Sequence, residues 1–131
     1  MTILVDASAI VAIVYGEPEA DHFADIIESH DDRCYCAVGA WEAAQAIARL
    51  KEVSLQQAAD AVLSFASEAG LRLVPIGENE GREAIVAAAR YGKGRHPAKL
   101  NMGDCFAYAC AKTHGAELLY KGNDFALTDL A

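Results

Sequence analysis

The sequence has little of what marks several other classes of protein. Three prolines and ten glycines in 131 residues, with no triplet repeat, exclude a collagen-like chain. No apolar run approaches the roughly 20 residues that a membrane-spanning helix needs, and the longest, from Ala7 to Tyr15, is interrupted by Ser8. The first residues carry no basic leader and reach an acid at Asp6, which is unlike a signal peptide. We therefore expect a soluble, cytoplasmic protein.

Cysteine spacing also fits none of the common metal or redox motifs. The four cysteines form a C-x-C pair, Cys34 and Cys36, and a C-x4-C pair, Cys105 and Cys110. Neither spacing matches a zinc finger or a thioredoxin-type C-x-x-C. Buried free thiols in a reducing compartment are the expected state.

Apolar residues, by contrast, are plentiful, and charge is unevenly distributed. Hydrophobic residues make up 53% of the chain, enough for one packed core, so we expect a single domain over residues 1–131. Residues 1–32 hold eight acids and no Lys or Arg, which accounts for the whole formal charge of −8. This acidity argues against a protein that coats nucleic acid with cations, but it leaves open a nucleic-acid enzyme that uses metal ions.

Hydrophobic patterning predicts strands that alternate with helices. Strands are expected at 2–5, 33–36, 71–76 and 116–120, and helices at 8–14, 18–29, 38–52, 54–69, 78–91 and 103–114. Residues 92–102 are expected to form a loop. The alternation predicts an α/β fold, a three-layer α/β/α sandwich around a short and mainly parallel sheet.

Four acidic residues follow predicted strands or open predicted helices. They are Asp6, Glu42, Asp104 and Asp124. In a parallel sheet with right-handed crossovers these positions share one edge, the edge where ligands bind. Each residue alone also has a structural explanation, as a helix cap, a turn former or part of a solvated helix face. Their convergence from distant parts of the sequence is what favours a functional site.

Such a cluster needs a compensating positive charge. Four neighbouring carboxylates do not all ionise at neutral pH without one. Oxygen ligands with no matching His or Cys favour Mg²⁺ or Mn²⁺ over Zn²⁺. A cation of this kind suits hydrolysis of a phosphodiester, because it lowers the pKa of a bound water and stabilises the charge on phosphate oxygens.

These residues lie in stretches that resemble the PIN-domain family, and in particular the VapC-type toxin ribonucleases of bacterial toxin–antitoxin pairs. The stretches are LVDASAIVAI at 4–13, CAVGAWEAA at 36–44, LNMGDCFAYACAK at 100–112 and LLYKGNDFALTDL at 118–130. The resemblance covers nearly the whole chain, and its last two stretches are the more specific. One departure is Cys36, which stands where such toxins often carry Ser.

The resemblance implies a PIN-like domain with metal-dependent endoribonuclease activity, held inactive by a cognate antitoxin. The catalytic and metal-binding acids would be Asp6, Glu42, Asp104 and Asp124, with Ser8, Asn101 and Asp129 as auxiliary groups. Four bases in or beside the 92–102 loop would draw in the RNA backbone: Arg90, Lys93, Arg95 and Lys99. A homodimer is expected as well, because helical apolar surface exceeds what a small sheet covers.

Three other functions compete with this interpretation. A catalytically silent PIN-like module that only binds a protein partner would be expected to lack one of the four acids, and none is lacking. A DNA-directed nuclease of the same fold stays open, because no residue is identified that reads a 2′-hydroxyl. An aspartyl-phosphate phosphatase is less favoured, because Ser8 stands where that chemistry wants a second acid.

Overall fold

A parallel sheet of four strands forms the centre of the molecule. The structure is a computed structural model that describes residues 1–131, and its strands are β1 (Thr2–Val5), β2 (Asp32–Cys36), β3 (Arg72–Val74) and β4 (Glu117–Leu119). The strand order is β3-β2-β1-β4, and each neighbouring pair is parallel. The first and last strands of the chain are therefore hydrogen-bonded neighbours, with Val5 opposite Leu119.

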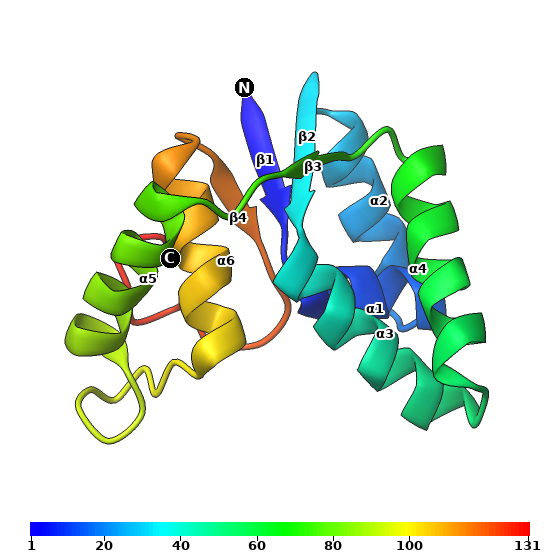
Figure 1. The fold of residues 1–131 in the computed structure, drawn as a ribbon. Coiled ribbons are helices and arrows are strands. Elements are labelled where there is room, and N and C mark those ends of the chain that lie inside the picture. The colour runs from blue at the N-terminus through cyan, green and yellow to red at the C-terminus, as the bar shows by residue number, and fades with distance from the viewer.

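Helices cover both faces of this sheet, which confirms the predicted three-layer sandwich (Figure 1). On one side lie α1 (Ala7–Tyr15), α2 (Ala20–Glu28), α3 (Ala37–Lys51) and α4 (Leu55–Glu68). On the other lie α5 (Glu78–Tyr91) and α6 (Met102–Thr113). Successive strand residues point to opposite faces, so Ile3 and Val5 pack with α1–α4 while Leu4 packs with α5 and α6. No helix is both long and apolar enough to cross a bilayer.

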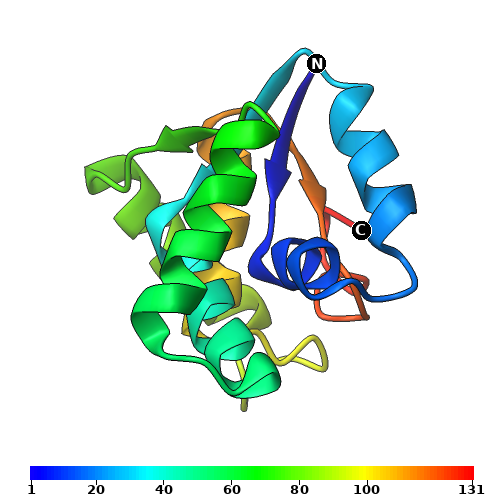
Figure 2. The ribbon, with the colours of Figure 1, turned by 90° about the vertical axis from the view of Figure 1, so that its right-hand side faces the viewer.

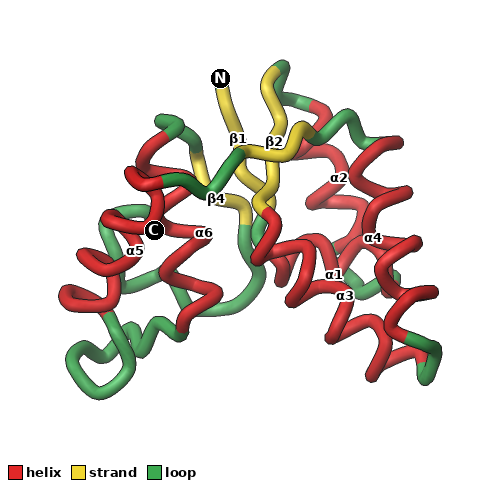
Figure 3. Tube along the Cα trace, viewed as in Figure 1, coloured by secondary structure: helices red, strands yellow, loops and turns green.

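Short connections place helix starts at the carboxyl ends of the strands. A single residue, Asp6, separates β1 from α1, and Cys36 ends β2 and also caps α3. Figure 2 shows α1, in blue, starting directly below the end of β1. The longest connection among the helices, residues 92–101, forms the loop at the lower left of Figure 3 between α5 and α6.

All ten predicted elements are present; two boundaries differ by two residues, and the others differ by one residue at most. The predicted helix at 18–29 begins only at Ala20, because residues 17–19 form a turn. The predicted strand at 71–76 is reduced to Arg72–Val74 at the edge of the sheet, where Pro75 has no N–H to continue the ladder. All four cysteines are buried and free, as expected. After β4, residues 120–131 form turns and no further strand.

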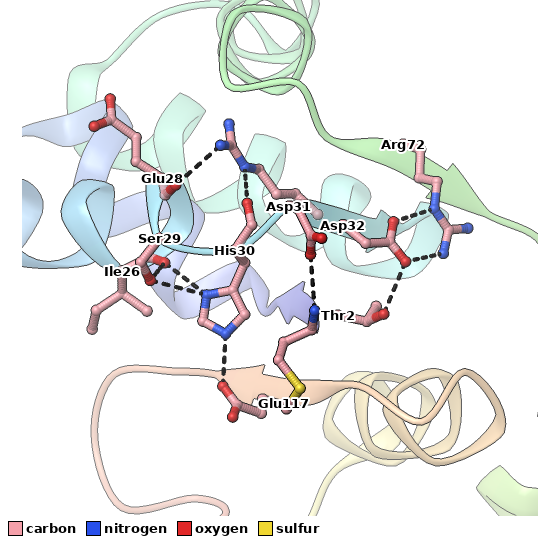
Figure 4. A network of polar contacts seen from close by, with 11 residues as sticks. Thr2, Ile26, Glu28, Ser29, His30, Asp31, Asp32, Arg72 and Glu117 are labelled. Atoms are coloured by element: carbon pink, nitrogen blue, oxygen red, sulfur yellow. Dashed lines mark hydrogen bonds and ion pairs between the residues drawn. The ribbon is translucent and has the colours of Figure 1, made fainter.

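The amino ends of the strands are joined by an ion pair across β2 and β3. Asp32 accepts two hydrogen bonds from the Arg72 guanidinium, at 2.8 and 3.0 Å, and one from the Thr2 hydroxyl at 2.9 Å (Figure 4). These donors, with Arg72 contributing most, lower the pKa of Asp32 to about 2. The carboxylate therefore stays ionised throughout the neutral range.

A second set of polar contacts links the same end of the sheet to α2 and β4. The His30 ring contacts the Ile26 carbonyl oxygen through Nδ1 and Glu117 through Nε2, both at 2.8 Å (Figure 4). The Ile26 carbonyl and then Glu117 raise the pKa of His30. Beside them the N-terminal ammonium of Met1 donates to Asp31 at 2.8 Å. Asp31 thus has a cationic partner, and Glu117 has one when His30 is protonated.

Candidate active site

The opposite end of the sheet contains a hollow of about 550 Å³. Its wall is formed by residues from both helical layers and from the loop after β4. All four predicted acids line it, together with two of the predicted auxiliary residues: Asp6, Glu42, Asp104, Asp124, Ser8 and Asn101. The topology therefore brings together residues separated by more than a hundred positions in the sequence.

Asp6 connects the first strand, the first helix and the last strand. Its carboxylate caps α1, accepting hydrogen bonds from the Ser8 N–H at 3.0 Å and the Ser8 hydroxyl at 2.6 Å. Its own N–H donates to the carbonyl of Leu119 in β4 at 2.9 Å. Burial raises the pKa of Asp6, and the Ser8 hydrogen bonds offset part of that rise. The capping role predicted as an alternative is therefore real, and it coexists with a place in the hollow.

Glu42 reaches the hollow from the second turn of α3. Its carboxylate lies against the backbone of Gly103, so closely that a Cβ at position 103 would coincide with it. Burial, followed by the charges of Asp6, Asp104 and Asp124, raises the pKa of Glu42 to about 7. A side chain at position 103 would therefore displace the Glu42 carboxylate, an effect of which local sequence patterns give no sign.

Asp104 is held at the start of α6 by a reciprocal pair of hydrogen bonds. The Asp104 N–H donates to the Asn101 side chain at 2.9 Å, and the Asn101 N–H donates to the Asp104 carboxylate at 3.2 Å. This arrangement is a capping box, which fixes the rotamer of both side chains. Burial raises the pKa of Asp104 to about 6, with contributions from Asp124 and Asp6, although the Asn101 hydrogen bond opposes the shift.

Asp124 completes the acidic wall from the loop that follows β4. It is exposed, unlike Asp6 and Asp104, and the turn that delivers it passes through Gly122 at a φ of 91°. Only glycine adopts this φ readily. The charge of Asp124 contributes to the raised pKa of Asp6, Glu42 and Asp104, which places it within electrostatic range of all three.

The acids are suited to an oxygen-binding cation by their chemistry. Every donor is a carboxylate, and none of the four makes an ion pair with a cation of the chain. Burial and repulsion disfavour the ionised forms of Asp6, Glu42 and Asp104, and a divalent cation would relieve both effects. The side chains do not form a closed ligand set, because no three His, Cys, Asp or Glu residues are grouped as a ready-made metal site. The donor chemistry fits a cation, and ligation would require these side chains to draw closer.

Two cations and a further acid also line the hollow, and the sequence analysis did not identify them. Lys121 pairs with Glu17 and, at 3.4 Å, with Glu19, which ties the loop after β4 to the turn between α1 and α2. Its backbone N–H also donates to the Ser8 hydroxyl at 2.9 Å. The second cation, Arg49, comes from the last turn of α3. Its position seven residues after Glu42 was the one available signal, because that spacing places both on one helix face.

The predicted RNA-binding bases lie outside the acidic hollow. Lys93 and Arg95 line a separate, mainly apolar cavity of about 610 Å³ between α5 and α6. Asn101 lines both cavities, so the two are adjacent. Arg90 lies over the Tyr91 ring with its guanidinium carbon 4.8 Å from the centroid. Lys99 is exposed in the intervening loop at a φ of 53°.

Asp129 also lies away from the acidic hollow. Its carboxylate accepts a hydrogen bond from the Tyr108 hydroxyl at 2.6 Å and pairs with Lys112. These contacts fasten the end of the chain to α6. An outer role in the acidic site therefore finds no support in the geometry, and a structural one does.

Comparison with known proteins agrees with this architecture. The family model described as PIN domain matches residues 3–130. A VapC ribonuclease of Rhizobium meliloti (strain 1021) is 41% identical, covering 96% of this chain and 97% of the relative. Ribonuclease VapC30 of Mycobacterium tuberculosis is 37% identical, covering 98% of this chain and 95% of the relative.

A solved structure shows the same fold at low sequence identity. The crystal structure of VapC20 from Mycobacterium tuberculosis, described as a toxin that cleaves the sarcin–ricin loop, superposes with a TM-score of 0.74. It covers 95% of this chain, and 92% of that chain is matched, at 15% identity. Family model, sequence relatives and fold together show that the chain belongs to the PIN-domain family and, within it, to the VapC ribonucleases.

Proposed function

We propose that residues 1–131 form a single domain that cuts RNA internally, as the toxin of a bacterial toxin–antitoxin pair acting in the cytoplasm. The observation that carries the proposal is the acidic hollow, where Asp6, Glu42, Asp104 and Asp124 converge without cationic partners. Membership of the VapC ribonucleases supports RNA as the substrate. The same hollow would serve a DNA-directed nuclease, so the experiment below includes DNA.

The four acids would bind Mg²⁺ or Mn²⁺, and neighbouring polar groups would fix the orientation of the acids. Such a cation lowers the pKa of a water molecule and stabilises charge on the phosphate oxygens of the substrate. Ser8 fixes the rotamer of Asp6 through two hydrogen bonds, and Asn101 does the same for Asp104. Gly103 leaves the space that the Glu42 carboxylate occupies. Each of these groups orients an acid, an effect that matters because small misplacements reduce rates strongly.

The basic loop would guide RNA toward the hollow from one side. Lys93 and Arg95 are exposed and make no ion pair with an acid of the chain. Asn101 lines both their cavity and the acidic hollow. An RNA strand bound at the loop would therefore reach the acids directly. Replacing Lys93 and Arg95 with Glu should weaken RNA binding and reduce its salt dependence.

An apolar groove between α3 and α4 supports the proposal that an antitoxin protein binds this chain. The groove has a volume of about 390 Å³, and seven of its eight lining residues are hydrophobic. Trp41, at 60% exposure, stands on its rim directly beside Glu42 in the sequence. Apolar surface of this kind suits the apolar face of a partner helix. A homodimer would cover other exposed apolar residues, such as Ile85 and Met102, and gel filtration tests it.

Cleavage assays test the enzymatic proposal directly. The protein is incubated with a panel of structured RNAs and with single- and double-stranded DNA, in Mg²⁺, in Mn²⁺ and in chelator. We expect RNA fragments with either metal and none with chelator. Cleavage of DNA alone would replace RNA as the substrate, and no cleavage of any nucleic acid would favour a silent protein-binding module.

A further inference from the structure

The two cations of the acidic hollow are in opposite electrostatic situations. Lys121 is engaged by Glu17 and Glu19, and these contacts raise its pKa and neutralise its charge locally. Arg49 is exposed and makes neither an ion pair nor a side-chain hydrogen bond, although it lines the same hollow. Among the residues that line the hollow, Arg49 is the only uncommitted positive charge.

The helix explains why Arg49 shares the wall with the acids without pairing with them. Arg49 follows Glu42 by seven residues, which is about two turns and a rise of roughly 10 Å along α3. The two side chains therefore share a face but lie too far apart for an ion pair. Ala46, between them on that face, also lines the hollow and leaves it open because its side chain is small.

The separation and the chemistry match an extended nucleic-acid strand. A short stretch of single-stranded backbone can span the distance from the acids to Arg49. Guanidinium binds phosphate through paired hydrogen bonds, and it is less strongly hydrated than an ammonium group. A polyanionic strand that enters a wall of carboxylates also needs positive charge beyond the point of cleavage.

We propose that Arg49 binds a backbone phosphate of the RNA next to the phosphate that is cut. The substrate then crosses the hollow from the basic loop at Lys93 and Arg95, past the acids, to the last turn of α3. This inference rests on the proposed function, because it names a contact of the same substrate. It assigns the binding of RNA to two cationic positions on opposite sides of the acids.

Two variants of Arg49 test the proposal, and a third variant, on the same helix turn, is the control. Arg49→Ala removes the contact and Arg49→Lys keeps the charge without the paired geometry. Lys51→Ala is the matched control, because Lys51 is also exposed, lies in the last turn of α3 and does not line the hollow. Loss of favourable charge at the helix end is therefore the same in both alanine variants.

The first measurement is binding of a fluorescent single-stranded RNA, followed by anisotropy in Ca²⁺ over a series of salt concentrations. Arg49→Ala should weaken binding about tenfold, the loss typical of one charge-assisted contact. The slope of log affinity against log salt should fall by about 0.7, the value for one phosphate on a single strand. Lys51→Ala should change neither by more than about twofold, and Arg49→Lys should lie between Arg49→Ala and the wild type.

Two further measurements separate binding from damage to the site. In Mg²⁺, Arg49→Ala should raise KM and leave kcat within about twofold, because the bound phosphate is not the reacting one. Titration with Mn²⁺ alone should show metal affinity equal to or tighter than that of the wild type, because a nearby positive charge has been removed. A distorted hollow would weaken both RNA and metal.

Several results would overturn the proposal. It fails if Arg49→Ala binds RNA like the wild type, if Lys51→Ala loses as much affinity, or if Arg49→Ala impairs only the response to an acidic protein partner. The outcome is separable from that of the proposed function. Wild-type protein that cuts no RNA contradicts the nuclease, whereas the anisotropy comparison still decides whether Arg49 binds a phosphate.

Discussion

At the amino ends of the strands Asp31 and Asp32 form ion pairs and Glu117 contacts the His30 ring, whereas at the carboxyl ends four carboxylates line a hollow and none of them forms an ion pair. The effects on pKa are opposite in direction. Arg72 helps lower the pKa of Asp32 to about 2, while burial and like charge raise that of Glu42 to about 7. Both ends belong to the same short sheet.

The difference shows where the fold leaves electrostatic energy unrelieved. At the amino ends the chain supplies its own counter-charges, so the contacts stabilise the folded state modestly and need nothing from outside. At the carboxyl ends the repulsion among Asp6, Glu42 and Asp104 remains until a ligand compensates it. A site that is costly when empty has a stronger tendency to bind a cation.

The largest expected effect comes from removing one acid at the carboxyl ends. Asp104→Asn should reduce RNA cleavage on the order of 1,000-fold, because a cation in such a site supplies several kcal/mol of transition-state stabilisation. Circular dichroism should show an intact fold. The matched change at the amino ends, Asp32→Asn, should lower the melting temperature and leave cleavage within about twofold. Equal loss of activity in both variants would contradict the distinction between the two ends.

One added methyl group should also impair RNA cleavage in the acidic hollow at the carboxyl ends of the strands. In Gly103→Ala the new methyl group takes the position of the Glu42 carboxylate, which must move because it is the flexible end of a side chain. We expect cleavage to fall about 100-fold, as for a displacement near 1 Å in an active site. Stability should change little, because the preference of a helix for alanine over glycine, about 0.8 kcal/mol, offsets the cost of moving the Glu42 carboxylate.

Gly81→Ala is the control for that change. A Cβ at Gly81, in α5, meets no atom within 4 Å, so this variant should gain the same helix stabilisation with normal cleavage. The role of Gly103 would be disproved by a Gly103→Ala variant that cuts RNA at the wild-type rate.

Divalent metal should stabilise the folded protein through the carboxyl ends alone. Mg²⁺ or Mn²⁺ at 100 times its dissociation constant should add about 2.7 kcal/mol to the free energy of unfolding. Differential scanning calorimetry with NaCl at matched ionic strength distinguishes binding from screening. Asp104→Asn should lose most of this gain, and Asp32→Asn should keep it. A gain of equal size in NaCl would argue against a specific cation site.

The smallest expected effect is a pH dependence at the amino ends. The Ile26 carbonyl and Glu117 raise the pKa of His30 in the folded protein. A raised pKa means that the stabilisation is complete below the ordinary histidine value, about 6.5, and disappears as pH rises through the folded-state value. His30→Gln should therefore destabilise the protein more at about pH 5.5 than at about pH 8.5 in urea denaturation. A destabilisation independent of pH would show that packing, not charge, is what His30 contributes.

Local sequence patterns predicted the strands, the helices and the position of Asp6, because neighbouring residues along the chain determine them. Apolar runs gave the strands, and the position of Asp6 directly after the first run was enough to place it at the carboxyl edge. Prediction was weaker where tertiary context decides. The edge strand β3 ends before Pro75, and the bond between Asp129 and Tyr108 depends on how the last residues fold back on α6.

The unpredicted residues of the site depend on contacts between distant segments. Gly103 matters only because Glu42, on another helix, approaches its backbone. Lys121 meets Glu17 across 104 positions, and no periodicity relates them. The spacing of Arg49 from Glu42 predicts a shared helix face, but the absence of an ion pair at Arg49 depends on which side chains of other elements lie near it, and no local pattern shows that.

The pairing of the first strand with the last one has a consequence for the timing of activity. Asp6 is anchored to Leu119, and the Ser8 that orients it is bound by the N–H of Lys121. During synthesis both anchors emerge from the ribosome more than a hundred residues after the acid that they fix. A growing chain therefore carries an incomplete acid set until residues beyond Lys121 and Asp124 have left the ribosome, so the ribonuclease site is assembled more than a hundred residues after synthesis of its first acid.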